Sequence, residues 1–258
     1  MRKKTVLLLT VLALDGIAAG VATSLIGRFA EGEVEANIAV TTPQLPEPGG
    51  KSESESEPED STSAAEMTAN QADEQKTAAL TFDDGPHPEC TMQLLDGLRE
   101  RGVKATFFLM GQSVEGNEEV VRTMQEDGHL IGNHCFQHIR MTKVSETEAC
   151  EAVSRTSERI EEITGTRPRY LRPPYGEWNE NLECLLDMTP VFWTLDSLDW
   201  KLQNADAIVR RVEKSVRDGD IILMHDIFPT SVEAALRLVD ELGAQGYRFV
   251  TAEELLVD

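Results

Sequence analysis

From Thr77 onward the chain alternates short apolar runs with longer amphipathic stretches, and this alternation strongly constrains its fold. Seven runs are predicted to be strands: 78–82, 105–109, 130–132, 170–172, 191–195, 221–224 and 248–250. Five stretches are predicted to be helices: 90–100, 118–127, 146–163, 205–216 and 231–242. Such alternation is typical of a parallel sheet covered by helices. We therefore predict an α/β domain, built as an open sheet or an imperfect barrel, whose active groups lie at the C-terminal strand ends.

Two adjacent carboxylates, Asp83 and Asp84, end the first predicted strand, and Gly85-Pro86 then turns the chain. Adjacent carboxylates repel each other and do not help folding. Such a pair is expected where a cation neutralises one carboxylate and the other carboxylate has a different chemical role. The alternative is a turn that uses both aspartates for backbone hydrogen bonds.

Polar or ionisable groups also follow four later strands. His134 and His138 follow the third strand, and on a helical turn two residues four apart share one face. Two histidines and one carboxylate form a three-ligand metal set with open coordination positions. The other strand ends carry Arg172, Asp199 and His225. Each residue alone also fits a core histidine, a helix cap or a surface ion pair, but together they predict an active site.

This combination closely resembles the polysaccharide deacetylase family with the NodB-homology domain (carbohydrate esterase family 4). The resemblance covers residues 77–258 and rests on five motifs in order: Thr81-Phe82-Asp83-Asp84-Gly85-Pro86, His134-x-x-x-His138, Arg172-x-Pro174-Tyr175, Asp196-x-x-Asp199-Trp200 and Leu223-x-His225. It implies a distorted, incomplete (β/α) barrel of about seven parallel strands, with the active site at the C-terminal strand ends.

The resemblance implies a metal site and a general base. Asp84, His134 and His138 are expected to bind one divalent metal, most often zinc, with cobalt, nickel or manganese as alternatives. Asp83 is expected to be the general base, and Arg172 to orient it. The chemistry agrees, because a metal polarises the acetyl carbonyl and lowers the pKa of water.

The resemblance also implies a general acid and a substrate pocket. His225 is expected to protonate the leaving amine, and the Asp199 carboxylate to favour the imidazolium that this step requires. The backbone N–H of Tyr175 is expected to stabilise the oxyanion. Trp200 and Leu223 are expected to line the pocket for the acetyl methyl group.

The sequence departs from the family pattern at Cys135, where Ser or Thr usually follows the first histidine of the second motif. In the family that hydroxyl braces the metal loop, so a thiol puts the rigidity of this loop in question. Direct metal ligation by Cys135 is a second interpretation. The other cysteines are Cys90, Cys150 and Cys184, and an even count in an exported protein permits disulfides of three connectivities.

The first 76 residues differ in character from the rest. Residues 1–26 carry a basic start and a mostly apolar segment, which predicts a signal sequence or membrane anchor. Residues 27–76 are acidic and rich in Ser, Glu and Pro, which predicts a disordered linker. The domain at 77–258 is then expected outside the cytoplasm, either anchored or secreted. The net charge of −22 argues against nucleic acid as a partner.

The leading functional hypothesis is therefore a metal-dependent hydrolase that removes N-acetyl groups from an N-acetylglucosamine-containing polymer. Peptidoglycan is the favoured polymer, because an anchor and a tether would keep the enzyme at its own cell wall. The alternatives are a chitin or exopolysaccharide deacetylase, an acetyl-xylan esterase, an amidase acting on small amides, and a catalytically inactive glycan-binding protein. The catalytic domain is expected to be monomeric.

Overall fold

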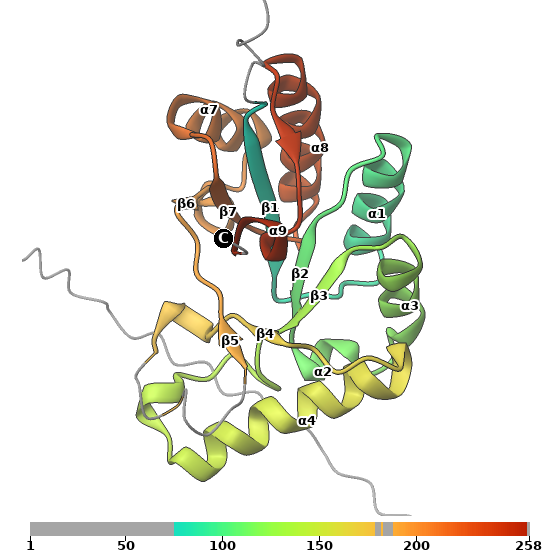
Figure 1. Cartoon of the computed structure of the whole chain (residues 1–258), viewed down its shortest axis with the longest axis vertical. Helices are drawn as coiled ribbons and strands as arrows, with labels where there is room; N and C mark the ends of the chain where they lie inside the picture. Colours follow the sequence, from blue (N-terminus) through green and yellow to red (C-terminus); the bar gives the residue numbers. More distant parts are fainter. Residues whose placement is uncertain (1–74, 179–181, 183–187, 257–258) are drawn as a thin grey trace, which may run out of the picture. The chain divides into compact units, whose positions relative to one another are not determined.

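The computed structural model describes residues 75–178, 182 and 188–256 of the 258-residue chain (Figure 1). The predicted anchor at 1–26 and the predicted linker up to residue 74 lie outside these described residues, as does Cys184. Within the described part, no helix has both the length and the apolar character needed to cross a membrane.

The strands of the described residues form one sheet in which each pairing is parallel. They are β1 (Thr77–Asp83), β2 (Thr106–Leu109), β3 (Leu130–Asn133), β4 (Tyr170–Leu171), β5 (Thr189–Pro190), β6 (Leu195–Asp196), β7 (Asp220–His225) and β8 (Arg248–Phe249). Their order across the sheet is β5-β4-β3-β2-β1-β7-β6, with β8 paired to β1. The sheet curls with β1 near its centre (Figure 1), which confirms the predicted incomplete barrel.

Most helices cover the convex side of the sheet, and the C-terminal one packs on the other face, where its Ala252 joins Ala79. Those described are α1 (Cys90–Glu100), α2 (Gly111–Val114), α3 (Glu118–Glu126), α4 (Glu146–Thr164), α6 (Asp199–Leu202), α7 (Ala205–Ser215), α8 (Pro229–Ala244) and α9 (Ala252–Leu256), with 3-10 turns η1 (Met141–Lys143) and η2 (Pro174–Gly176). The outer layer runs α7, α8, α1, α3, α4, each contacting the next (Figure 1). These are the five predicted helices, and their ends fall within two residues of the prediction.

Alternation along β1 separates the main core from the site. Ala78, Leu80 and Phe82 pack into the main core against the helices. Ala79 belongs to a second cluster on the opposite face. Because successive side chains of a strand point to opposite faces, Asp83 lies on the same face as Ala79. The concave face of the barrel therefore passes from apolar packing to charged groups at its C-terminal edge.

The predicted strand at 191–195 is wrong over most of its length, because only its last residue lies in a strand, β6. Between β5 and β6 the carbonyl of Val191 accepts a hydrogen bond from Arg172 Nε at 3.2 Å. The next carbonyl, that of Phe192, accepts one from Arg172 Nη2 at 3.5 Å. A buried guanidinium thus takes carbonyls that a neighbouring strand would otherwise pair with. Residues 191–194 therefore form a connection between β5 and β6, which lie at the two ends of the strand order.

Candidate active site

The residues predicted from sequence to form a site converge on one cavity of about 500 Å³. Its walls are formed by Asp83, Asp84, His134, His138, Arg140, Tyr175, Glu177, Trp193, Asp196, Trp200, Leu223 and His225. Arg172 and Asp199 are fully buried behind this wall, where they bond to Asp83 and His225. The structure therefore brings together all ten predicted site residues.

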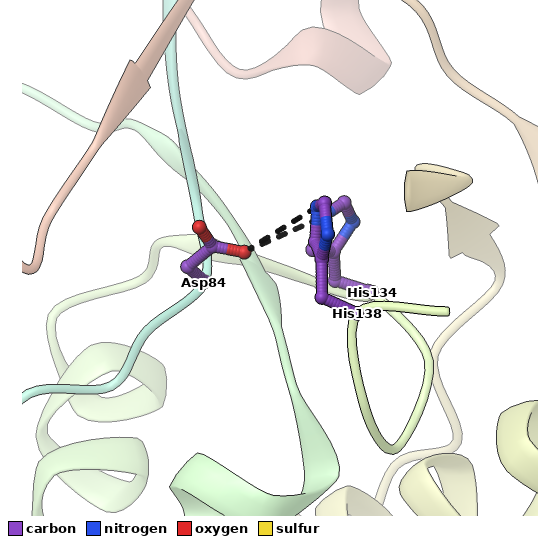
Figure 2. A group of neighbouring side chains, drawn as sticks. All are labelled: Asp84, His134 and His138. Carbon is purple, nitrogen blue, oxygen red and sulfur yellow. Dashed lines mark ion pairs between the residues drawn. The ribbon is translucent and has the colours of Figure 1, made fainter. Parts of the chain in front are cut away.

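A three-residue group among the residues that line the cavity has the composition of a metal site. The Asp84 carboxylate, just after β1, faces the imidazoles of His134 and His138 from the loop after β3 (Figure 2). Asp84 Oδ1 lies 3.5 Å from His134 Nε2 and 3.9 Å from His138 Nε2. Within the part of the chain that the structure describes, this is the group able to supply three ligand atoms to one ion.

The chemistry of these three groups fits a divalent cation. Asp84 Oδ1 is buried and has no hydrogen-bond partner among the described residues, which is costly unless a cation occupies the space beside it. His134 Nδ1 lies 2.7 Å from the carbonyl oxygen of Arg172, and a carbonyl can only accept. The proton therefore sits on Nδ1, and the Nε2 lone pair faces Asp84. Burial is the largest cause of a lowered pKa at His138, and this favours the neutral imidazole that can ligate a metal.

The loop that carries the histidines is not the helical turn predicted from their spacing. Residues 134–140 form an irregular loop with a bend at residues 136–137, and Cys135 adopts a left-handed backbone with φ of 63°. The turn is held by Asn133, whose Oδ1 accepts from the Cys135 N–H at 2.7 Å. Asn133 Nδ2 in turn donates to Ser157 Oγ at 2.9 Å and to the Val153 carbonyl at 2.8 Å. The two rings still meet, with centroids 5.2 Å apart.

The Cys135 side chain lies away from the metal group, in an apolar cluster that includes Met141, Val153 and Leu171. Burial raises the pKa of this thiol to about 12, so it is protonated and poorly suited to metal binding. Bracing of the loop, which sequence reasoning assigned to the side chain at position 135, comes from Asn133 instead. Cys90, Cys135 and Cys150 are free thiols in the structure.

On one side of the metal group, Asp83 is paired with a fully buried arginine. Arg172 Nη1 donates to Asp83 Oδ1 at 2.9 Å and to Thr81 Oγ1 at 2.7 Å. The guanidinium also lies 4.3 Å from the centroid of the Phe108 ring. These contacts fix one carboxylate oxygen of Asp83. The other, Oδ2, lies 3.8 Å from His134 Nε2, on the side of the metal group.

On the other side, His225 is paired with a fully buried aspartate. Asp199 Oδ1 lies 2.8 Å from His225 Nδ1, and Oδ2 accepts the backbone N–H of His225 at 2.7 Å. Burial opposes the charge of His225, but the hydrogen bond and negative charge of Asp199 raise its pKa to about 9. Burial likewise opposes ionisation of Asp199, and the bonds to His225 hold its pKa below the usual value. His225 Nε2 is left facing Asp84 Oδ2 at 3.9 Å.

Sheet register explains why these two sides meet. Asp83 is the register partner of His225 on the parallel strands β1 and β7. Asp196 on β6 is the register partner of Leu223 on β7. Side chains at matching positions of parallel strands lie on the same face, so the ends of three strands deliver their groups to one place.

A stack of side chains borders the cavity beside His138. The ring of Tyr175 lies edge-on to His138 with centroids 4.3 Å apart, and the guanidinium of Arg140 lies 4.1 Å from the Tyr175 ring. Arg140 pairs with Glu177, whose second oxygen accepts from the Thr142 hydroxyl at 2.7 Å.

Sequence reasoning missed four residues of the cavity wall: Arg140, Glu177, Trp193 and Asp196. Asp196 belonged to the fourth motif, which was a usable signal. Arg140 and Glu177 are 37 residues apart and meet only through tertiary packing. No local sequence pattern identifies the other three.

Comparisons with known sequences agree with this geometry. Residues 70–189 match the sequence model described as polysaccharide deacetylase. The chain is 42% identical over 181 residues to the peptidoglycan-N-acetylmuramic acid deacetylase PdaC of Bacillus subtilis. It is 39% identical over 180 residues to the peptidoglycan-N-acetylglucosamine deacetylase PgdA of Listeria monocytogenes. Each match covers 70% of this chain and 39% of the relative, so the chain spans about two fifths of the length of these relatives.

Solved structures give the same result. The structure of PdaC from Bacillus subtilis superposes with a TM-score of 0.69 at 42% identity, covering 71% of this chain and 91% of that one. A family 4 acetyl xylan esterase from Clostridium thermocellum, solved with a cobalt ion, gives a TM-score of 0.66 at 36% identity, covering 70% and 90%. Because nine tenths of these solved chains align at 36% identity or more, the chain belongs to the polysaccharide deacetylase family.

Proposed function

We propose that this protein is a metal-dependent deacetylase that hydrolyses N-acetyl groups on the sugars of peptidoglycan. The observation that carries the proposal is the cavity itself. In this cavity the Asp84 carboxylate and two histidines lie between two buried ion pairs. These pairs are Asp83–Arg172 and Asp199–His225. Hydrolysis of an amide needs an electrophilic centre, a base and an acid, and this cavity offers groups suited to each.

The cofactor we propose is one divalent ion held by Asp84, His134 and His138. Two neutral imidazoles and one carboxylate suit zinc, and cobalt, nickel or manganese accept the same donor set. When bound, such an ion supplies Lewis acidity, which polarises an acyl carbonyl and makes water more acidic. The protein contributes the orientation of its ligands, through the bond between His134 Nδ1 and the Arg172 carbonyl.

Asp83 and His225 are proposed to move the protons. Arg172 holds Asp83 Oδ1, so Oδ2 is the oxygen that accepts the proton of the attacking water. Asp199 holds His225 Nδ1, so Nε2 is the atom that delivers a proton to the leaving amine. A pKa of about 9 keeps His225 protonated at neutral pH, as a general acid requires.

The cavity wall is proposed to hold the acetyl group and the sugar. The Tyr175 backbone N–H is assigned to the oxyanion, where a donor stabilises developing negative charge. Trp200 and Leu223 offer apolar surface to the acetyl methyl group. Tyr175 and Trp200 are each 50% exposed, so their rings are also available to pack against a sugar.

Peptidoglycan is proposed as the substrate because PdaC and PgdA are named for deacetylating it. Their names differ in the sugar, N-acetylmuramic acid for one and N-acetylglucosamine for the other, so the residue attacked is a question for experiment. The acetyl xylan esterase among the solved relatives keeps ester hydrolysis as the alternative to be tested. Residues 1–26 are proposed to direct export and to anchor the chain, with residues 27–76 as the tether of a monomeric catalytic domain.

The test is acetate release by the purified full-length chain, with metal content measured in parallel. The substrates are peptidoglycan, N-acetylglucosamine oligomers and acetylated xylan. The proposal predicts release from peptidoglycan that is lost on chelation and returns when Zn²⁺ is added. Release that is unchanged by chelation would overturn the metal-dependent mechanism. Tight binding to glycan without acetate release, in metal-loaded protein, would instead identify an inactive binding protein.

A further inference from the structure

A buried carboxyl group that takes no part in the proposed chemistry lies next to the metal site. Asp226 follows His225 directly and is 1% exposed. Its Oδ2 accepts a hydrogen bond from the Thr91 hydroxyl of α1 at 2.5 Å. Its Oδ1 has no hydrogen-bond partner within the described part of the chain. Burial of a carboxyl group with one unsatisfied oxygen is costly, and the contacts of Asp226 show what its position provides in return.

The Asp226 carboxyl group fills the place where a side chain of residue 85 would lie. A Cβ added to Gly85 would be 2.4 Å from both carboxyl oxygens of Asp226, which is too close for a non-bonded contact of a Cβ atom. Gly85 is itself buried, so the absence of a side chain at position 85 is what permits the contact. The end of β7 therefore supports the turn that follows β1.

The backbone carbonyls of the turn after β1 also accept hydrogen bonds from the segment that follows β2. The Gly85 carbonyl accepts from the Met110 N–H at 3.0 Å. The Asp84 carbonyl accepts from the Ser113 hydroxyl at 3.1 Å. Between these supports Asp84 has a φ of 74°, a left-handed conformation that is unfavourable for a residue other than glycine. Such a conformation persists only where the surrounding structure enforces it.

We propose that Asp226 is a positioning residue for Asp84: by packing against Gly85 and bonding to Thr91, it holds the turn that aims the Asp84 carboxylate at His134 and His138. The inference rests on the proposed function, because it takes Asp84 as a metal ligand. Two adjacent residues at the end of β7 would then act on the site in different ways. His225 lines the cavity, and Asp226 packs against the turn that carries Asp84.

Three single variants and one double variant test this role through Zn²⁺ affinity, measured by competition with a chromophoric chelator. Asp226→Ala is expected to weaken Zn²⁺ binding by about 10–100-fold, as is typical when support of a ligand is removed. Asp226→Asn keeps the shape and the Thr91 bond, and it is expected to retain most of the affinity. Gly85→Ala forces a clash and is expected to weaken binding. Adding Asp226→Ala to Gly85→Ala is expected to recover part of that loss, because the new methyl group fills the space left by the carboxyl group.

The matched control is His129→Ala, which removes a buried polar side chain at the opposite end of the sheet, where Nδ1 accepts from the Ala105 N–H. This control is expected to lower thermal stability without changing Zn²⁺ affinity. If Asp226→Ala also lowers stability but binds Zn²⁺ as tightly as the wild type, the positioning role is overturned and the proposed function stands. If the wild-type protein binds no Zn²⁺ and releases no acetate, the proposed function fails and this inference fails with it.

Discussion

The two ion pairs that flank the metal group are built in opposite senses. In the Asp83–Arg172 pair the cation is fully buried, and the carboxylate lines the cavity. In the Asp199–His225 pair the carboxylate is fully buried, and the imidazole lines the cavity. In the second pair the buried Asp199 favours the charged form of His225, while in the first pair Arg172 bonds to one oxygen of Asp83. One cavity thereby carries a carboxylate and a protonated imidazole at register-matched ends of β1 and β7, each bonded to a buried partner.

The largest expected effect comes from removing the carboxylate of the first pair. Asp83→Asn keeps the shape of the side chain but removes its basicity, so acetate release is expected to fall by about 10²–10⁴-fold. Steady-state kinetics on metal-loaded protein measures this change. Asp240→Asn is the control, since that carboxylate pairs with Arg101 on the exposed surface and activity should not change. A variant with Asn at position 83 that works at the wild-type rate would remove Asp83 from the mechanism.

Removing the buried cation of the same pair tests stability. Arg172→Met leaves Asp83 buried without a partner, and breaking a buried pair in this way costs about 3–5 kcal/mol of unfolding free energy. Chemical denaturation of the metal-free protein measures the change. Arg101→Met breaks an exposed pair with Asp240, which is expected to cost about 0–1 kcal/mol. Equal losses for the two variants would show that burial does not distinguish this pair from a surface one.

Removing the buried carboxylate of the second pair tests the pH dependence of the acid. Because the reaction needs the His225 imidazolium, the rate should fall as pH rises through its pKa of about 9. In Asp199→Asn the negative charge is lost, so this fall should move toward about pH 6.5, the usual value for histidine. A pH–rate profile of kcat measures the shift. An unchanged alkaline limb would mean that another group supplies the proton.

The raised pKa of His225 also has a consequence for folding. A group whose pKa is higher in the folded state stabilises the fold at low pH, where it is protonated in both states. That contribution is complete below about pH 6.5 and is lost as pH rises through about 9.

The smallest expected effect on activity concerns the loop between the two pairs. Cys135→Ser places a hydroxyl group in an apolar cluster, so it should lower stability by about 1–3 kcal/mol. Acetate release should stay close to the wild-type rate, because Asn133 holds the loop. Asn133→Ala is the contrasting variant and should lower activity as well as stability. A large gain in activity from Cys135→Ser would show that the side chain at position 135, and not only Asn133, holds the loop that carries the histidines.

The sequence predicted those features that depend on local pattern. The five main helices follow from amphipathic periodicity, and their ends were located within two residues. The ten site residues follow from motifs at strand ends, and all of them meet at one cavity.

The errors trace to contacts with segments distant in sequence, and in the histidine loop these are the bonds from Asn133 to Val153 and Ser157. The strand predicted at 191–195 is interrupted because Arg172, 19 residues earlier, takes the Val191 carbonyl. The predicted helical turn at His134 and His138 is absent, since Asn133 holds Cys135 in a left-handed conformation. Asp226 gave no signal, because its role depends on the approach of β7 to the turn after β1.

The proposed mechanism depends most on Asp199, which keeps the His225 imidazole charged. The most direct test is an NMR titration of the His225 imidazole in the metal-free protein, with Asp199→Asn as the matched variant. We expect a midpoint near pH 9 in the wild type and a lower midpoint in the variant. A wild-type midpoint at or below the usual value of about 6.5 would contradict it.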